Sequence, residues 1–167
     1  MTDTDSAVPP GSGSSGPQER LAALGLTLPA VVAPLAAYVP AVRSGAMIYT
    51  AGQLPMVDGQ LVSAGKVGAE VGAAEAAALA RTCALNALAA AASVAGGLSS
   101  IKRIVKLTGF VASSPDFTGQ PQVVNGASEL LLEVFGDAGR HARSAVGTAA
   151  LPLNAPVEIE LIVEVED

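Results

Sequence analysis

The chain has 167 residues, of which 50% are hydrophobic, 3% aromatic and 14% charged, and its formal net charge is -6. This length is sufficient for one domain with a real hydrophobic core. Binding to the phosphate backbone of a nucleic acid needs a positively charged protein surface. The excess of acidic residues, with a pI of about 4.7, argues against such a surface, so a nucleic-acid partner is not expected.

The first 17 residues, "MTDTDSAVPPGSGSSGP", are rich in serine, glycine and proline. This composition is typical of a flexible tail, and the segment lacks the basic and apolar regions of a secretory signal. The single cysteine, Cys83, excludes an internal disulfide and fits a reducing compartment. We therefore expect a tail over residues 1–17, one domain over residues 18–167 and a cytoplasmic location.

A short helix and two hairpins are predicted first along the chain. The segment "PQERLAALGL" predicts a helix that begins near Pro17 and stops near Gly25. The segment "AYVPAVRSGAMIYTAG" predicts two strands with a turn at "RSGA", and Pro40 indicates that the first strand is an edge strand or is bulged. The Asp-Gly pair in "MVDGQLV" predicts a tight turn.

An alanine-rich stretch over residues 72–95 predicts the first long helix. Its mostly apolar composition raises the question of a membrane span, which needs about 20 apolar residues with few charges. The stretch contains Glu75, Arg81 and Asn86. We therefore expect a soluble helix that is buried on one face, and no membrane partner.

Four further elements complete the predicted fold. "IKRIVKLTGFVAS" predicts a long strand, residues 120–135 predict a second helix that stops at Gly136, and "RSAVGTAAL" and "VEIELIVEV" predict the last two strands. The order β-β-α-β-α-β-β places two long helices on one face of a mixed β-sheet. The predicted fold class is an α+β sandwich.

The last predicted strand has two different faces, because alternate residues of a strand point in opposite directions. One face is apolar and suits packing against the helices: Val157, Ile159, Leu161, Val163 and Val165. The other face mixes carboxylates with one isoleucine: Glu158, Glu160, Ile162, Glu164 and Glu166. We expect this second face to be either solvated or covered by another subunit.

Two residues on the last strands are candidates for chemistry. Arg143 has small neighbours, "SAVG", and an arginine fork binds a carboxylate through two parallel hydrogen bonds. Glu158 near such an arginine would stay ionised and could orient a water molecule or accept a proton. The alternative for Arg143 is an ordinary ion pair with one of the glutamates, and for Glu158 a solvated position on the strand.

The remaining candidates are weaker. His141 is the only histidine and is expected at the surface, and Cys83 is expected to be a small buried hydrophobic residue rather than a nucleophile. Neither G-x-x-x-x-G-K-[ST] nor G-x-G-x-x-G occurs in a strand–helix context, so a phosphate-binding loop is not predicted.

Three segments together resemble a known family: "AYVPAVRSGAMIYTAGQLP", "VKLTGFVASSPDF" and "ARSAVGTAALPLNAPVEIE". They resemble the Rid family, also called YjgF or L-PSP endoribonuclease, over about residues 20–165, and suggest a separate bacterial branch of it. The resemblance implies a chorismate-mutase-like α+β domain that forms a trimeric barrel, with helices outside and ligand sites between subunits. It also implies hydrolysis of reactive enamines and imines to 2-oxoacids and ammonia, without a metal or organic cofactor.

The resemblance assigns roles to individual positions. Arg143 matches the arginine that binds the substrate carboxylate, and Glu158, fifteen positions later, matches the glutamate that holds the attacking water. Tyr38 matches a tyrosine that lines the cleft. Gly52 matches the glycine of an "S-G-Q" block, and Asn125 matches an asparagine at the start of the second long helix.

The chain departs from the family pattern at two cleft positions. Ala51 stands where active members have serine, and Ala145 stands where many have cysteine. Two functions therefore remain open. The first is a deaminase for 2-iminoacids or enamines. The alternative is a non-catalytic trimer that binds a small carboxylate in the same cleft.

Overall fold

The computed structural model describes residues 15–31 and 37–166. Helices and strands follow one another along the chain as α1 (Pro17–Ala23), β1 (Ala41–Ser44), β2 (Met47–Thr50), β3 (Met56–Val57), β4 (Gln60–Leu61), α2 (Ala73–Ala95), β5 (Ile101–Ala112), α3 (Gln120–Phe135), β6 (Ala142–Thr148) and β7 (Val157–Val165). Short 3-10 turns lie at Leu98–Ser100, Gly136–Gly139 and Pro152–Asn154. The predicted tail over residues 1–17 lies outside the described residues except for its last three, and Pro17 already begins α1.

Five strands form one mixed sheet in the order β1-β2-β7-β5-β6. β5 lies between its antiparallel neighbour β7 and its parallel neighbour β6, so β6 is an edge strand. β1 is the other edge strand, and Pro40 precedes it directly. The predicted edge position of this strand is therefore confirmed. β3 and β4 form a separate hairpin whose turn residues, Asp58 and Gly59, both have positive φ, as the Asp-Gly signal predicts.

The two long helices begin and end at glycines. α2 lies between Gly72 and Gly96, and Gly96 has a left-handed φ of 87° that ends the helix with a bond from its N–H to the Ala92 carbonyl. α3 lies between Gly119 and Gly136, and Gly136 also has a positive φ. Glycine adopts this conformation without the Cβ clash that other residues meet. The predicted bounds of both helices are confirmed.

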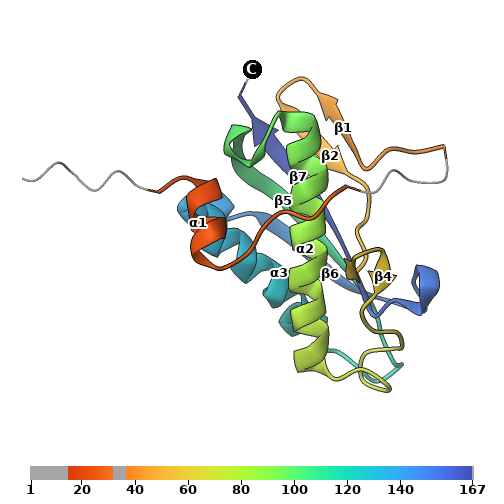
Figure 1. Ribbon diagram of the computed structural model, residues 1–167. Coiled ribbons are helices and arrows are strands. Elements are labelled where there is room, and N and C mark those ends of the chain that lie inside the picture. The colour runs from red at the N-terminus through yellow and green to blue at the C-terminus, as the bar shows by residue number, and fades with distance from the viewer. Residues whose placement is uncertain (1–14, 32–36, 167) are drawn as a thin grey trace, which may run out of the picture.

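Both helices cover one face of the sheet (Figure 1). The apolar residues of β7 that the alternation assigns to the core, from Val157 to Val165, are buried at 0–2% exposure. They contact α2, which also packs along α3. An α+β sandwich with a mixed sheet and two helices on one face is therefore confirmed.

α2 is the one helix in the described part of the chain that is long and apolar enough to cross a membrane by length and composition. In the fold, 56% of the most apolar 18-residue stretch of this helix is buried inside the protein. Ala76, Leu79, Cys83 and Leu88 are among its buried residues. The helix therefore supplies one side of the core, as the sequence predicts.

No helix within residues 15–31 and 37–166 covers the opposite face of the sheet. The register places Glu164 beside Met47 and Ile162 beside Tyr49 on this face, and Tyr49 is 45% exposed. Glu158 lies on it beside Phe110. We call it the open face. It combines apolar side chains with carboxylates, as the alternation in the last strand predicts.

Candidate functional site

Arg143 is the second residue of β6, and neutral side chains of α3 hold its guanidinium. Its Nη1 donates to Asn125 Oδ1 at 2.7 Å and to Ser128 Oγ at 3.2 Å. Asn125 and Ser128 are three residues apart, so they lie on the same face of the helix. The family resemblance assigns Asn125 to the site but does not assign Ser128. The three-residue spacing of Ser128 from Asn125 on a helix would have placed both on the same face.

The alternative role of Arg143, an ion pair with a glutamate, is absent from the described residues. Ion pairs there join Arg81 to Glu133, Lys102 to Glu164, and Arg140 to Asp137. Because its two hydrogen-bond partners are neutral, the charge of Arg143 has no carboxylate beside it in this part of the chain. An exposed guanidinium in this arrangement is suited to an external anion.

His141 continues the hydrogen-bond network of Arg143. Its Nδ1 lies 2.6 Å from the Gly139 carbonyl oxygen and its Nε2 lies 3.0 Å from Ser128 Oγ. A carbonyl only accepts, so Nδ1 donates, and in the neutral ring Nε2 then accepts the Ser128 hydroxyl proton. The sequence places His141 at the surface, but the structure shows it partly buried in this network.

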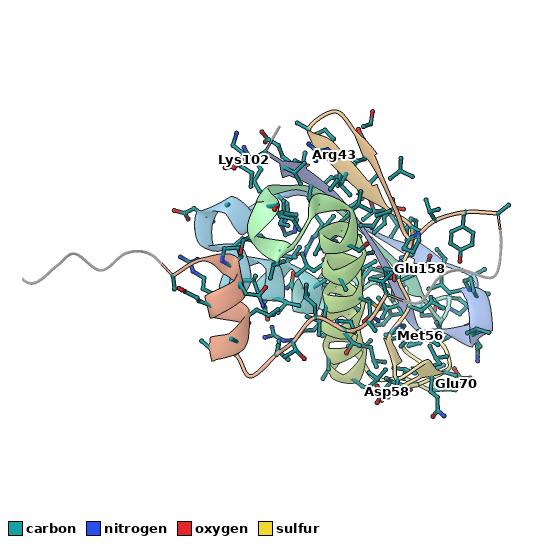
Figure 2. The ribbon with its side chains drawn as sticks, turned by 45° about the horizontal axis from the view of Figure 1, so that its top comes forward. Arg43, Met56, Asp58, Glu70, Lys102 and Glu158 are labelled. Atoms are coloured by element: carbon teal, nitrogen blue, oxygen red, sulfur yellow. The ribbon has the colours of Figure 1, made fainter. Side chains whose placement is uncertain are left out.

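Glu158 is the second residue of β7 and is half-buried. Burial raises the pKa of its carboxyl group above the ordinary value, and repulsion from the Glu160 carboxylate raises it further. In Figure 2 it lies toward the hairpin that carries Met56 and Asp58, away from the end of the sheet that carries Arg43. A carboxylate with a raised pKa is a better proton acceptor than an ordinary one.

Gly52 lies against Glu158, as the resemblance implies for two residues of one site. A Cβ built on Gly52 would overlap Glu158 Oε1, so only glycine leaves the carboxylate in its present position. The loop is fixed by two backbone bonds: Gln53 N–H donates to the Ile159 carbonyl at 2.8 Å, and Ile159 N–H donates back at 3.0 Å.

Arg143 and Glu158 lie on opposite faces of the sheet. Arg143 is beside Leu107, which is beside Leu161, and both leucines are buried under the helices. Glu158 is beside Phe110 on the open face. Residues in register on neighbouring strands point to the same side. One chain therefore supplies two separate groups of candidate residues, Arg143 with Asn125 and Glu158 with Gly52.

The other three predicted site residues are dispersed. Ala51 N–H donates to the Pro40 carbonyl at 2.8 Å, so Ala51 is adjacent to the Glu158 group through Gly52. Ala145 packs against the core and is two residues from Arg143, on the same face. Tyr38 is 60% exposed and makes no hydrogen bond with the described residues.

Cys83 is fully buried, and its Sγ lies 3.6 Å from the Val157 carbonyl oxygen. Burial raises the pKa of the thiol well above its usual value, and the negative charge of Glu158 raises it further. A thiol that resists ionisation is a poor nucleophile. The predicted role as a small buried hydrophobic residue is confirmed.

A cavity of about 310 Å³ lies beside the Arg143 group. Its lining residues are Ser128, Leu132, Gly139, Arg140, His141 and Arg143. The cavity places open space next to the guanidinium that the helix holds in position.

Comparison with known proteins gives one consistent result. A family described as "YjgF/chorismate_mutase-like, putative endoribonuclease" matches residues 18–165. Protein TCP17 of Trypanosoma cruzi is 47% identical over 149 residues, which are 89% of this chain and 93% of that protein.

Solved structures agree with this match. The protein Atu1372 of Agrobacterium tumefaciens, of unknown function, is 50% identical, with a TM-score of 0.82 over 90% of this chain and 94% of that one. TdcF of E. coli with bound serine is 26% identical, with a TM-score of 0.59 over 81% of this chain and 92% of that one. The chain therefore belongs to the YjgF/chorismate-mutase-like family and has its α+β fold.

Proposed function

We propose that the protein hydrolyses 2-iminoacids to 2-oxoacids and ammonia, in clefts between the subunits of a homotrimer. The observation that carries this proposal is the guanidinium of Arg143, which Asn125 and Ser128 hold in position beside a cavity without neutralising it. Such a group binds the carboxylate that every 2-iminoacid carries. E. coli TdcF binds serine, an amino acid with the same carboxylate, which supports a ligand of this class.

The reaction needs a nucleophilic water and a place for its proton. Water adds to the imine carbon, and the C=N bond becomes a C–N single bond as the water proton passes to the Glu158 carboxylate. Glu158 returns this proton to the nitrogen, which gives a neutral carbinolamine. The hydroxyl proton then passes by way of the Glu158 carboxylate to the nitrogen, the C–N bond breaks, and ammonia leaves as the carbonyl of the 2-oxoacid forms. The raised pKa of Glu158 suits both the uptake and the return of this proton.

The opposite orientations of Arg143 and Glu158 support a site between two subunits. The open face that carries Glu158 has exposed apolar residues such as Val42, Tyr49 and Val146, and exposed apolar patches of this kind favour contact with another protein surface. If a second subunit covers the open face, the Arg143 group of one subunit and the Glu158 group of its neighbour form one cleft. The proposed homotrimer provides three such clefts by symmetry.

A binding protein without catalysis is the second candidate. The specific observation in its favour is that Ala51 and Ala145 present no polar side chain where the family pattern has serine and cysteine. The Arg143 group is complete without them, so carboxylate binding would persist. In this alternative the protein retains the carboxylate ligand and lacks turnover.

Ammonia release distinguishes the two candidates. An amino-acid oxidase generates the 2-iminoacid in situ, and the rate of ammonia formation is measured with wild-type protein, with Arg143→Ala and with Glu158→Gln. The proposal expects acceleration by the wild type alone, while Glu158→Gln still binds 2-oxobutyrate. Wild-type protein that binds 2-oxobutyrate and leaves the spontaneous rate unchanged would contradict the hydrolase and favour the binding protein.

A further inference from the structure

We propose that the cavity beside Arg143 holds a second acidic group, so that the preferred substrates are 2-iminoacids with an acidic side chain. This inference rests on the proposed function and adds a substrate class to it. In this arrangement Arg143 binds the carboxylate next to the imine. Arg140, with His141 beside it, receives the side-chain carboxylate.

The lining of the cavity favours an anion. Arg140, His141 and Arg143 line the space of about 310 Å³, and no lining residue is acidic. A second cavity of about 590 Å³ shares Arg140 and His141 and adds Arg103. The second cavity has one acidic residue in its lining, Glu164.

This concentration of positive charge contrasts with the rest of the chain. The protein has nine Lys and Arg residues and a net charge of -6. Three of the nine, Arg103, Arg140 and Arg143, line the two adjoining cavities. In a protein of opposite overall sign, a local group of positive charges raises the concentration of anions at that point.

Both guanidinium groups have donors left for a ligand. Arg143 uses Nη1 for Asn125 and Ser128, which leaves its other N–H donors. Arg140 uses Nε for Asp137 at 3.2 Å, in a pair whose side chains are 73% and 96% exposed. An exposed pair of this kind is weak. Arg140 therefore has its terminal nitrogens available for a bound carboxylate.

The cavity is open to solvent, and its volume and lining suit a short ligand. Its volume lies at the lower end of the range for small-molecule pockets, about 300–1,000 Å³, which suits a short dicarboxylate of about five carbons. Leu132 forms an apolar wall, suited to the methylene groups between the two acidic ends. His141 has both ring nitrogens engaged, so its role is to hold Ser128 in position.

A matched pair of product-like ligands tests this substrate class. 2-Oxoglutarate and 2-oxopentanoate have the same five-carbon chain, and a methyl group in the second replaces the side-chain carboxylate. Calorimetric titration of the wild-type protein should show about five-fold tighter binding of 2-oxoglutarate, the ratio that corresponds to about 1 kcal/mol for an exposed ion pair. The preference should shrink as salt concentration rises.

Variants assign the preference to Arg140. Arg140→Gln should weaken the binding of 2-oxoglutarate and leave the binding of 2-oxopentanoate unchanged. The two affinities should therefore become similar. Lys66→Gln removes one positive charge near the bridge between Val67 and Ser113, at the far end of β6, and should preserve the preference. Asp137→Asn removes the carboxylate that competes for Arg140, so the preference for 2-oxoglutarate should stay the same or increase.

Equal wild-type affinities for the two ligands would overturn the proposed substrate class. A preference that survives in Arg140→Gln would overturn the assignment of the second group to this cavity. Arg143→Ala distinguishes these outcomes from failure of the proposed function. This variant should bind both 2-oxoglutarate and 2-oxopentanoate more weakly than the wild type. If both bind unchanged to Arg143→Ala, the carboxylate anchor itself is wrong, and the proposed function fails with the inference.

Discussion

Arg143 is held by hydrogen bonds that it donates to two neutral side chains. This predicts separate effects of its substitution on binding and on stability. Arg143→Lys keeps the charge but loses the planar fork, and Arg143→Ala loses both. Calorimetric titration with 2-oxobutyrate should show affinity losses of about ten- to a hundred-fold, the equivalent of about 1.5–3 kcal/mol for a hydrogen bond to a charged group.

Thermal melts of the same variants provide the control. Arg143 is exposed and makes no ion pair with the described residues. Its replacement should therefore change the free energy of unfolding by about 1 kcal/mol or less. Unchanged 2-oxobutyrate binding together with a large fall in melting temperature would show that Arg143 only supports the structure.

Glu158 predicts a pH-dependent effect on stability. Folding raises the pKa of its carboxyl group, so the folded chain binds more protons than the unfolded chain. The contribution of this group to the stability of the folded chain is fully present below the ordinary carboxyl pKa. It is lost as the pH rises through the raised pKa, because the half-buried group must then ionise. For Glu158→Gln, the melting temperature relative to wild type should therefore increase between about pH 4 and pH 7.

The same Glu158→Gln protein should hydrolyse iminoacids far more slowly while it keeps its affinity for 2-oxobutyrate. A gain in stability combined with a loss of turnover is typical of a residue retained for function. A relative melting temperature that falls as the pH rises over this range would contradict the raised pKa.

At the scale of elements, the contact between the loop at Gly52 and strand β7 sets the position of the Glu158 carboxylate. Gly52→Ala places a Cβ on Glu158 Oε1, the end of a flexible side chain that moves at low cost. We expect a large loss of ammonia release with a change of less than about 1 kcal/mol in the free energy of unfolding. Gly72→Ala is the matched control, because its added Cβ meets nothing within 4 Å; it should leave turnover unchanged. Full activity of Gly52→Ala would show that the carboxylate position is unimportant.

The sequence predicts the elements well because their signals are local. Glycines at positions 72, 96 and 136 mark helix ends, and the alternation of Val157 to Val165 marks a strand with one buried face. The strand order is not local: β7 is inserted between β2 and β5, and β6 is placed at the edge. Such pairings depend on contacts between distant segments, which no single stretch of sequence encodes.

The strand order also explains which part of the site was predictable. Family resemblance assigns Arg143 and Glu158 to one site, and spacing along α3 would add Ser128 to the Arg143 group. The sequence does not show that the two residues point to opposite faces, because this follows only from the register through Leu107 and Phe110 of β5. The role of His141 depends equally on a fold that brings it to Ser128.

At the scale of the whole molecule, the open face predicts self-association. It carries exposed apolar residues between carboxylates, and no helix of the described chain covers it. Light scattering at micromolar concentration should give three times the chain mass of 16.4 kDa. A monomer mass under these conditions would contradict the trimer and the proposed site between subunits.

The central claim is that Arg143 of one subunit acts with Glu158 of the partner subunit. Arg143→Ala and Glu158→Gln chains, each inactive alone, are co-expressed with different tags, and the mixed trimers are isolated for the ammonia assay. Every mixed trimer pairs an intact Arg143 with an intact Glu158 from the neighbouring subunit in one of its three clefts, so about a third of wild-type turnover should return. Mixed trimers that stay as inactive as their parents would contradict the account, because a site built within one subunit cannot be restored by mixing.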